Sequence, residues 1–366
     1  MLSFWEKESL ITYDIIIIGA GITGLSSAIS ILEKNPKLSV AIFEAGILPS
    51  GASTRNAGFA CFGSLSELMS DEKSLGTDKM LQLVQDRWEG LRILRERLGD
   101  DNLEFFQLGG YELVFDSINF EENAQLMNQK LNTIFNTSVF RNATSELKNF
   151  GFNKKYVKQL IYNPYEGQIH TGKMMKALAN KATCMGITIY TNSRVKSLTP
   201  KGVIVGEVEF KSNQTLICTN AFTKSLLPKL LLKPGRGQVC ITKPIKNLNI
   251  KGIFHYDEGY YYFRNIDNRI LFGGGRNQDF QNEESTEIKI NDKIQIHLID
   301  ELKSKILPST PFEIDLQWSG IMAFGDDKFP ILKRVNERTV VAAKLGGIGI
   351  ALGSKLGKAA AELTLN

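Results

Sequence analysis

Apolar residues recur along the chain at two spacings, and each spacing predicts a class of element. Residues 14–18 are a short run of mostly β-branched apolar side chains, which is typical of a buried strand. Apolar positions at helical spacing follow from Leu25 to Leu32, and a second apolar run covers residues 38–43. The first part of the chain is therefore predicted to form a strand, a helix and a second strand.

The remaining chain carries a mixed pattern. Helices are predicted at 77–98, 121–134, 143–151, 173–185, 287–306 and 354–363. Strands are predicted at 109–115, 186–192, 237–241, 259–264, 269–273 and 340–343, with a meander marked by Val195, Val203, Val208 and Leu216. Because Asp267 and Asn268 supply a turn between two late strands, the second half is expected to be antiparallel. The predicted fold class is α/β, with a second domain of α+β type.

Length and charge narrow the class of protein. The chain has 366 residues, 43% of them hydrophobic, and is expected to form two domains with full cores. Its formal net charge of +5 is spread without a block of like charges, so no nucleic-acid partner is expected. Residues 1–12 lack the apolar stretch of a signal peptide, and no apolar run is long enough for a membrane span.

Cysteines and histidines are few and scattered, which argues against a metal centre. The four cysteines form no CxxC pair: Cys61, Cys184, Cys218 and Cys240. They are expected to be reduced thiols in the core or in a pocket of a cytoplasmic protein. The three histidines are dispersed along the chain: His170, His255 and His297. No metal ligand is predicted.

A glycine motif, Gly19-Ala20-Gly21-Ile22-Thr23-Gly24, joins the first predicted strand to the first helix. In such a motif Gly19 permits the tight turn, Gly21 lets a pyrophosphate approach the backbone, and Gly24 lets the helix pack on the strand. The helix N-terminus then offers free N–H groups to phosphates. Glu44 ends the second strand, where its carboxylate suits the ribose hydroxyls. These features predict a dinucleotide-binding unit for NAD or FAD.

Two further stretches indicate contact with a bound cofactor. The loop at 49–58 is rich in small and hydroxyl residues and contains Arg55, so it offers hydrogen-bond donors and one positive charge. Near the C-terminus, Leu345-Gly346-Gly347-Ile348-Gly349-Ile350 follows a strand and precedes a helix. Too few residues follow for a second nucleotide fold. This helix N-terminus is therefore expected to face an electron-rich group such as the pyrimidine edge of a reduced flavin.

Together with the hairpin at 261–274, these segments resemble the FAD-dependent D-amino-acid oxidase superfamily. Within it, the chain is most similar to the branch of glycine/sarcosine oxidases and γ-glutamylputrescine oxidases. The resemblance implies a Rossmann-like FAD domain of the glutathione-reductase-2 type and an antiparallel-sheet substrate domain. It divides the chain into an FAD domain at 1–75, 145–225 and 320–366, and a substrate domain at 76–144 and 226–319.

The resemblance also implies which residues bind FAD. They are Gly19, Gly21, Ile22, Thr23, Gly24, Glu44, Ala45, Ser53, Thr54, Arg55, Asn56, Ala57, Gly58, Val195, Asn220, Ala221, Gly320, Gly346, Gly347, Ile348, Gly349 and Ile350. Relatives that attach FAD covalently use a late cysteine or a histidine near the first loop, and this sequence has neither. FAD is therefore expected to be bound non-covalently.

The sequence departs from the family pattern at two positions. Where glycine-oxidase-like members carry an arginine for the substrate carboxylate, this chain has a segment around Met322. The lysine that sarcosine oxidases carry for oxygen activation is replaced near Leu271. A carboxylate anchor would then be Arg264, Arg276 or Lys344.

Three residues are candidates for contact with the substrate or the flavin: Arg264, Tyr262 and Lys344. Arg264 shares a strand face with Tyr262, and the alternative is a strand arginine paired at the surface. Lys344 interrupts an apolar strand end, where a lysine also occurs as a rim residue. His255 and Cys61 are interpreted as structural, His255 as a core histidine and Cys61 as a small hydrophobic residue of the pocket.

The function predicted is oxidation of the C–N bond of a small amine or amino acid by hydride transfer to FAD. The expected electron acceptor is O2, a quinone or another electron carrier. The alternatives are a flavoprotein dehydrogenase of a 2-hydroxy acid, an NAD-dependent dehydrogenase, and a non-catalytic or tRNA-modifying flavoprotein. The NAD alternative leaves the 49–58 loop unexplained, and the tRNA alternative lacks an extra domain and a basic stripe.

Overall fold

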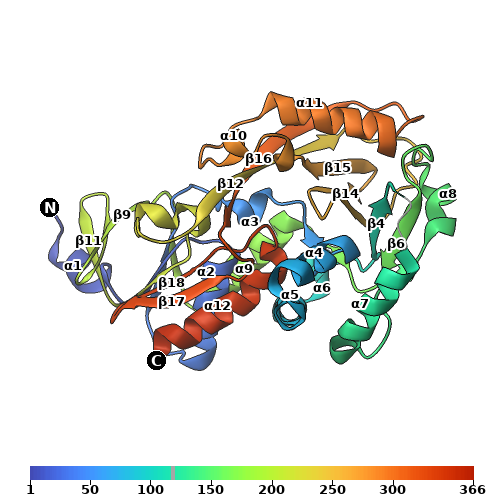
Figure 1. Ribbon diagram of the computed structural model, residues 1–366. Helices are drawn as coiled ribbons and strands as arrows, with labels where there is room; N and C mark the ends of the chain where they lie inside the picture. Colours follow the sequence, from blue (N-terminus) through green and yellow to red (C-terminus); the bar gives the residue numbers. More distant parts are fainter. Residues whose placement is uncertain (117–119) are drawn as a thin grey trace.

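The computed structural model describes residues 1–116 and 120–366, which fold around two large sheets (Figure 1). The first sheet has the order β17-β18-β11-β1-β2-β8, with a meander attached at β11. Its strands are β1 (Thr12–Ile18), β2 (Val40–Phe43), β8 (Thr188–Tyr190), β9 (Val195–Thr199), β10 (Gly202–Val205), β11 (Val208–Ile217), β17 (Ile331–Asn336) and β18 (Thr339–Ala343). The central strands β18, β11, β1, β2 and β8 are parallel, as the dinucleotide-binding prediction requires.

The second sheet has the order β16-β12-β15-β14-β13-β4-β6-β5. Its strands are β4 (Gly110–Val114), β5 (Arg141–Asn142), β6 (Gln159–Asn163), β12 (Lys233–Thr242), β13 (Ile253–Tyr256), β14 (Tyr261–Ile266), β15 (Arg269–Gly274) and β16 (Ile314–Phe324). Every pairing in it is antiparallel except that of β13 with β4, so the strands after Pro234 pair with one another in antiparallel fashion, as predicted. A short ribbon of β3 (Phe59–Ala60) and β7 (Gly167–Gln168) completes the strands of the described residues.

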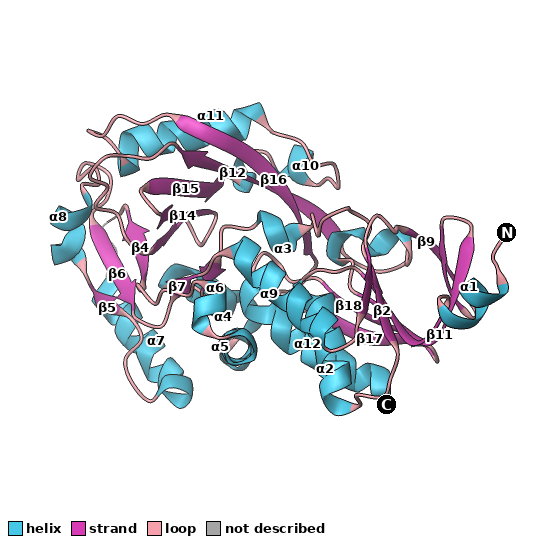
Figure 2. Ribbon diagram, turned by 180° about the vertical axis from the view of Figure 1, so that it is seen from behind, coloured by secondary structure: helices cyan, strands magenta, loops and turns pink. Residues whose placement is uncertain are grey.

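Helices cover both sheets (Figure 2). The α-helices are α1 (Phe4–Ser9), α2 (Ile22–Lys34), α3 (Ala52–Arg55), α4 (Leu65–Leu75), α5 (Thr77–Leu98), α6 (Asp100–Leu103), α7 (Phe120–Phe135), α8 (Leu147–Phe150), α9 (Thr171–Cys184), α10 (Phe280–Glu283), α11 (Asp292–Glu301) and α12 (Gly349–Leu365). Shorter turns are η1 (Thr144–Glu146), η2 (Asn220–Ser225), η3 (Arg276–Gln278) and the π-helical η4 (Leu302–Ile306). Within the described ranges, no helix combines the length and the apolar character that crossing a bilayer requires.

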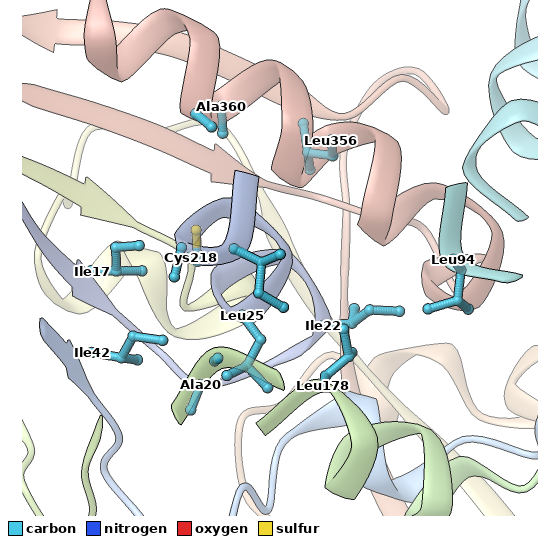
Figure 3. Packing of buried hydrophobic residues seen from close by; sticks show 14 of the residues in the cluster. Ile17, Ala20, Ile22, Leu25, Ile42, Leu94, Leu178, Cys218, Leu356 and Ala360 are labelled. Atoms are coloured by element: carbon cyan, nitrogen blue, oxygen red, sulfur yellow. The ribbon is translucent and has the colours of Figure 1, made fainter. Parts of the chain in front are cut away.

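The helix α2 is the centre of the largest core cluster. It lies between the first sheet and the helices α12 and α9, and Figure 3 shows Leu25 of α2 among Ile17, Leu178 and Leu356. All four side chains are 6% exposed or less. Because α2 is buried almost all round, its N-terminus and the glycine-rich turn before it are held in a fixed position.

Most elements that the apolar spacing predicts are present, and the differences concern bounds and short elements. The predicted helix at 77–98 is α5 with the same bounds. The predicted helix at 287–306 begins only at Asp292, where Asn291 caps it, and its last turn is π-helical. The loop at 49–58 contains the short helix α3, and the elements that were not predicted include α4, β6, β13 and β17.

The division of the chain into domains stays a prediction. Strand β16, which spans the expected boundary at residue 320, pairs along its whole length with β12 of the second sheet. Residues 117–119, which fall in the predicted range 76–144, lie outside the described residues.

Candidate active site

One cavity of about 890 Å³ is lined by elements of both sheets. The first sheet contributes the carboxyl ends of β1 and β2, and the second contributes residues of β12, β13 and β14. Most of the predicted site residues line it: Gly19, Gly21, Ile22, Thr23, Glu44, Ala45, Ser53, Arg55, Asn56, Ala57, Gly58, Val195, Asn220, Tyr262, Gly320, Gly346, Gly347, Ile348, Gly349 and Ile350. Five predicted residues are outside the described lining: Gly24, Thr54, Ala221, Arg264 and Lys344.

Two helix N-termini whose own cap residues supply no side-chain acceptor meet at this cavity. Gly21 precedes α2 and Ile348 precedes α12, and neither cap residue accepts a hydrogen bond from the first turn through its side chain. The first backbone N–H groups of a helix need an acceptor, and the helix dipole favours negative charge there. The cavity therefore suits a ligand with electron-rich groups at two points, as the phosphates and the pyrimidine edge of FAD would provide.

The glycine motif packs too closely for side chains at its turn. A Cβ at Gly24 would lie 2.0 Å from the carbonyl oxygen of Gly19, so Gly24 allows α2 to begin directly against the turn after β1. At Gly21 a Cβ would lie 3.1 Å from Oγ of Ser53, which also accepts a hydrogen bond from the amide of Ile22 at 3.0 Å. The loop at 49–58 is thus joined directly to the start of α2.

Hydrogen bonds within the loop at 49–58 fix its shape. Asn56 donates through Nδ2 to the carbonyl oxygens of Ala52 and Ser53, each at 3.0 Å, and its Oδ1 accepts from the amide of Gly58 at 2.8 Å. The guanidinium of Arg55 donates to the carbonyl oxygen of Ser319 on β16 at 3.0 Å. The loop therefore connects the nucleotide-binding half to the second sheet and lies along the cavity.

An aromatic wall closes the side of the cavity formed by the second sheet. The ring of Phe59 packs edge-on against Tyr262 and His255, with centroid distances of 5.5 and 5.1 Å. His255 and Tyr262 are directly paired across β13 and β14. Burial raises the pKa of Tyr262 to about 12, so its hydroxyl is protonated at neutral pH.

Arg264 and Lys344 are both buried beside the cavity. Arg264 lies near Gly58, is 4% exposed, and has no ion-pair or hydrogen-bond partner among the described residues, and burial lowers its pKa to about 10. Lys344 forms an ion pair with Asp327 at 2.6 Å, which engages its ammonium group. The roles predicted for these two residues stay predictions.

Three arginines line the cavity, none with a carboxylate partner among the described residues: Arg55 donates to backbone carbonyl oxygens, Arg194 is exposed beside β9, and Arg276 follows β15 on the side of the second sheet. The guanidinium of Arg276 lies over the rings of Phe324 and Phe280, with centroid distances of 4.1 and 4.9 Å. Burial lowers its pKa, and no acidic side chain of the described residues lies within 4 Å of it. Stacking on two aromatic faces holds a guanidinium in place while its N–H edges stay available to a planar anion.

A buried cluster on the cavity wall was missed by sequence reasoning. Cys61, Glu166 and His255 bring one ligand atom each within 4.8 Å of one another, although they lie on separate elements. Cys61 and His255 line the cavity. Burial raises the pKa of Cys61 well above its ordinary value, so the thiol is neutral. The prediction of core or pocket thiols is wrong for Cys184, which is exposed.

Comparisons with known proteins agree with this geometry. The model of the FAD-dependent oxidoreductase family (DAO) matches residues 14–363. Gamma-glutamylputrescine oxidoreductase of Escherichia coli (strain K12) is 25% identical over 370 residues, covering 96% of this chain and 84% of that protein. Glycine oxidase from Geobacillus kaustophilus superposes with a TM-score of 0.76 at 20% identity, covering 97% of this chain and 95% of that one. L-proline dehydrogenase from P. horikoshii has a TM-score of 0.76 at 19% identity, covering 96% and 93%.

Proposed function

This chain belongs to the FAD-dependent oxidoreductase family, with FAD as its cofactor, and we propose that it oxidises the C–N bond of a small amine that also carries a carboxylate. The observation that carries the proposal is the unpaired guanidinium of Arg276 in the same cavity as the two helix N-termini. The helix N-termini then suit an electron-rich cofactor, and the guanidinium of Arg276 suits the carboxylate of a substrate in the same cavity.

In this proposal, different residues stabilise the cofactor, anchor the substrate and exclude water. FAD supplies the acceptor for the hydride that leaves the carbon bearing the amine. The start of α12 stabilises negative charge that develops on the cofactor, because its free N–H groups face the cavity. Arg276 holds the substrate carboxylate, and Phe59 and Tyr262 form an apolar wall that excludes water from the reacting carbon.

The named activities of the similar proteins supply a panel of candidate substrates. Each carboxylate-bearing amine has a partner that lacks only the carboxylate: γ-glutamylputrescine with N-(4-aminobutanoyl)putrescine, L-proline with pyrrolidine, and glycine with methylamine. Anaerobic bleaching of the flavin is followed for each compound in a stopped-flow instrument. We expect at least one carboxylate-bearing amine to reduce the flavin, and its partner to react more slowly.

The variant Arg276→Met tests the anchor. A charged hydrogen bond to a carboxylate contributes about 1.5–3 kcal/mol, so its loss lowers kcat/KM by roughly 10- to 150-fold for the carboxylate-bearing member of a pair. The partner compound should be unaffected. Arg264→Met is the comparison variant, because Arg264 is equally free of a partner but outside the described lining of the cavity. A selective loss in Arg264→Met instead would move the anchor to that residue.

The alternative substrate class is a 2-hydroxy acid, which Arg276 would hold in the same way. Bleaching by L-lactate or glycolate, with none of the amines reacting, would replace amine oxidation by hydroxy-acid oxidation. The electron acceptor, which we propose to be O2, a quinone or another carrier, is identified by comparing turnover in air with turnover on a quinone under nitrogen.

A further inference from the structure

His255 and Glu166 form a buried pair at the cavity wall. Nε2 of His255 lies 3.3 Å from Oε2 of Glu166, and the two residues are 5% and 1% exposed. His255 lines the cavity, whereas Glu166 lies behind it, outside the described lining. Nε2 is buried and makes no aligned hydrogen bond with the described residues, so its contact with Glu166 is an ion-pair contact. The adjacent carboxylate favours a proton on Nε2, which leaves Nδ1 as the nitrogen that can accept a proton from a group in the cavity.

The carboxylate of Glu166 is fixed from two sides. Its Oε1 faces the amides of Phe62 and Gly63, at 3.3 and 3.4 Å. On the other side it packs against Gly110 of β4, where a Cβ would lie 2.0 Å from Oε2. A side chain larger than hydrogen at residue 110 would displace it. The carboxylate of Glu166 is therefore kept within ion-pair distance of the imidazole of His255, where it favours the protonated ring.

The charged groups around His255 come from several elements. Glu166 precedes β7, Glu67 lies on α4, Glu112 lies on β4, and the neutral thiol of Cys61 follows β3. Burial lowers the pKa of His255, but the carboxylate of Glu166, and then those of Glu67 and Glu112, outweigh burial and raise it above its ordinary value. Acidic neighbours therefore stabilise a proton on His255.

We propose that His255, paired with Glu166, accepts the proton that the substrate ammonium group must lose before oxidation. This inference rests on the proposed function, because it names the base for that amine. An amine of ordinary pKa enters at neutral pH as an ammonium ion, which has no lone pair to assist the departure of a hydride. The N–H bond breaks, its electron pair stays on nitrogen, and the proton moves to Nδ1 of His255. The resulting imidazolium is stabilised by the carboxylate of Glu166.

The kinetic test uses the pH dependence of anaerobic flavin reduction by γ-glutamylputrescine, L-proline and glycine. In His255→Gln we expect reduction near pH 7.5 to slow by about 10²- to 10⁴-fold, the usual contribution of a positioned base. The loss should shrink as the pH approaches about 10, because solvent then deprotonates the amine. In Glu166→Gln the acid limb of kcat/KM should move to lower pH, because removing the carboxylate lowers the pKa of His255.

His297→Gln is the matched control, because His297 contacts Tyr261 at 2.8 Å and is outside the described lining of the cavity. Its pH profile should equal that of the wild type. An equal loss at every pH in His255→Gln would make His255 structural and overturn the proposal. Stoichiometric zinc in the purified protein, lost in Cys61→Ser, would overturn it as well, because the cluster of Cys61, Glu166 and His255 would then be a metal site.

A second measurement is independent of substrate. The chain has three histidines, so the imidazole signals of ¹⁵N-histidine-labelled holoenzyme are assigned from single substitutions. His255 should titrate above the ordinary histidine value, and Glu166→Gln should bring it down. A titration unaffected by Glu166→Gln would contradict the pair itself. If no amine bleaches the wild-type flavin, the proposal of amine oxidation is wrong, and so is the role of His255 as its base. If His255 still titrates above the ordinary value and Glu166→Gln brings it down, the pair exists and the error lies in the proposed function.

Discussion

The carboxylate of Glu44 accepts a hydrogen bond from the amide of Ala20 at 3.0 Å, which joins the end of β2 to the glycine-rich turn after β1. Its other oxygen accepts from the amide of Gly46 at 2.9 Å. Glu44 lines the cavity, so these two amides hold its carboxylate where a ribose would lie. The residue that the motif assigns to the cofactor thus also orders the backbone around the site.

Replacing Glu44 by alanine should weaken FAD binding by about 1–3 kcal/mol, because charge-assisted hydrogen bonds to the ribose are lost. Titration of the apoprotein with FAD, followed by quenching of flavin fluorescence, measures the change. Glu44→Gln removes the negative charge but keeps the length of the side chain. It should weaken FAD binding less than Glu44→Ala does. An affinity unchanged in Glu44→Ala would mean that another group binds the ribose.

Gly21→Val should abolish FAD binding. Gly21 lines the cavity, and a Cβ at this position would already lie 3.1 Å from Oγ of Ser53, so a branched side chain would crowd Ser53 and extend into the space that the glycine motif leaves for a pyrophosphate. Gly21→Ala is the graded control, because the backbone at Gly21 has a φ of −75° that alanine adopts and its single Cβ adds less volume than valine. The flavin content of the two purified variants is compared, and stoichiometric flavin in a folded Gly21→Val protein would contradict the prediction.

Local sequence signals predicted residues of the nucleotide half that line the cavity, and their contact with FAD stays a prediction. Each of these signals lies within a short stretch of sequence: the glycine turn, the acidic residue that ends the second strand, and the glycines before α12. Each can therefore be recognised from neighbouring residues alone. The short helix α3 was missed, because Ala52–Arg55 has too few residues for an apolar period. Strand β13 was missed for the same reason of length.

The substrate side was less predictable, because its contacts join distant segments. Period-two spacing places Arg264 and Tyr262 on one face of β14, but the described lining of the cavity includes Tyr262 and not Arg264. Glu166 and His255 meet only because β4, which carries Glu112, pairs with β13 and packs against the segment before β7. No sequence pattern within either segment predicts the contact between Glu166 and His255, so His255 was interpreted as a core residue.

FAD should leave the protein completely on acid precipitation. The cavity wall includes the thiols of Cys61 and Cys218, but burial raises the pKa of both, Cys218 to about 12, and a neutral thiol is a poor nucleophile. The yellow colour should therefore appear in the supernatant. Colour retained in the pellet of the wild type but not of Cys61→Ser would show a covalent bond to that residue.

The native protein should show one rapidly reacting thiol. Cys184 is exposed, whereas Cys61, Cys218 and Cys240 are buried with raised pKa values, and the thiolate is the reactive form. Labelling of the holoenzyme with iodoacetamide, followed by peptide mass spectrometry, should modify Cys184 first. Cys184→Ser should remove the fast phase, and a remaining fast phase would show that the cavity exposes a second thiol.

Gly90→Ala should destabilise the protein, because it separates two helices that touch through backbone. Gly90 lies on α5, and a Cβ there would be 1.9 Å from the carbonyl oxygen of Ala351 on α12. Since the obstacle is backbone and not the end of a flexible side chain, α5 has to move away from α12. Overpacking of this kind costs about 1–3 kcal/mol.

The start of α12 lines the cavity, so the same displacement should also weaken FAD binding. Gly172→Ala is the comparison variant: it is also a helical glycine, but a Cβ there meets the ring of His170 at 3.3 Å, whose Nδ1 accepts from the amide of Lys173. A side chain can shift where backbone cannot, and alanine favours a helix over glycine, so this variant should lower the midpoint much less than Gly90→Ala. Thermal unfolding of both variants, with and without added FAD, measures the two effects. An unchanged midpoint in Gly90→Ala would mean that the contact between α5 and α12 is looser than the structure has it.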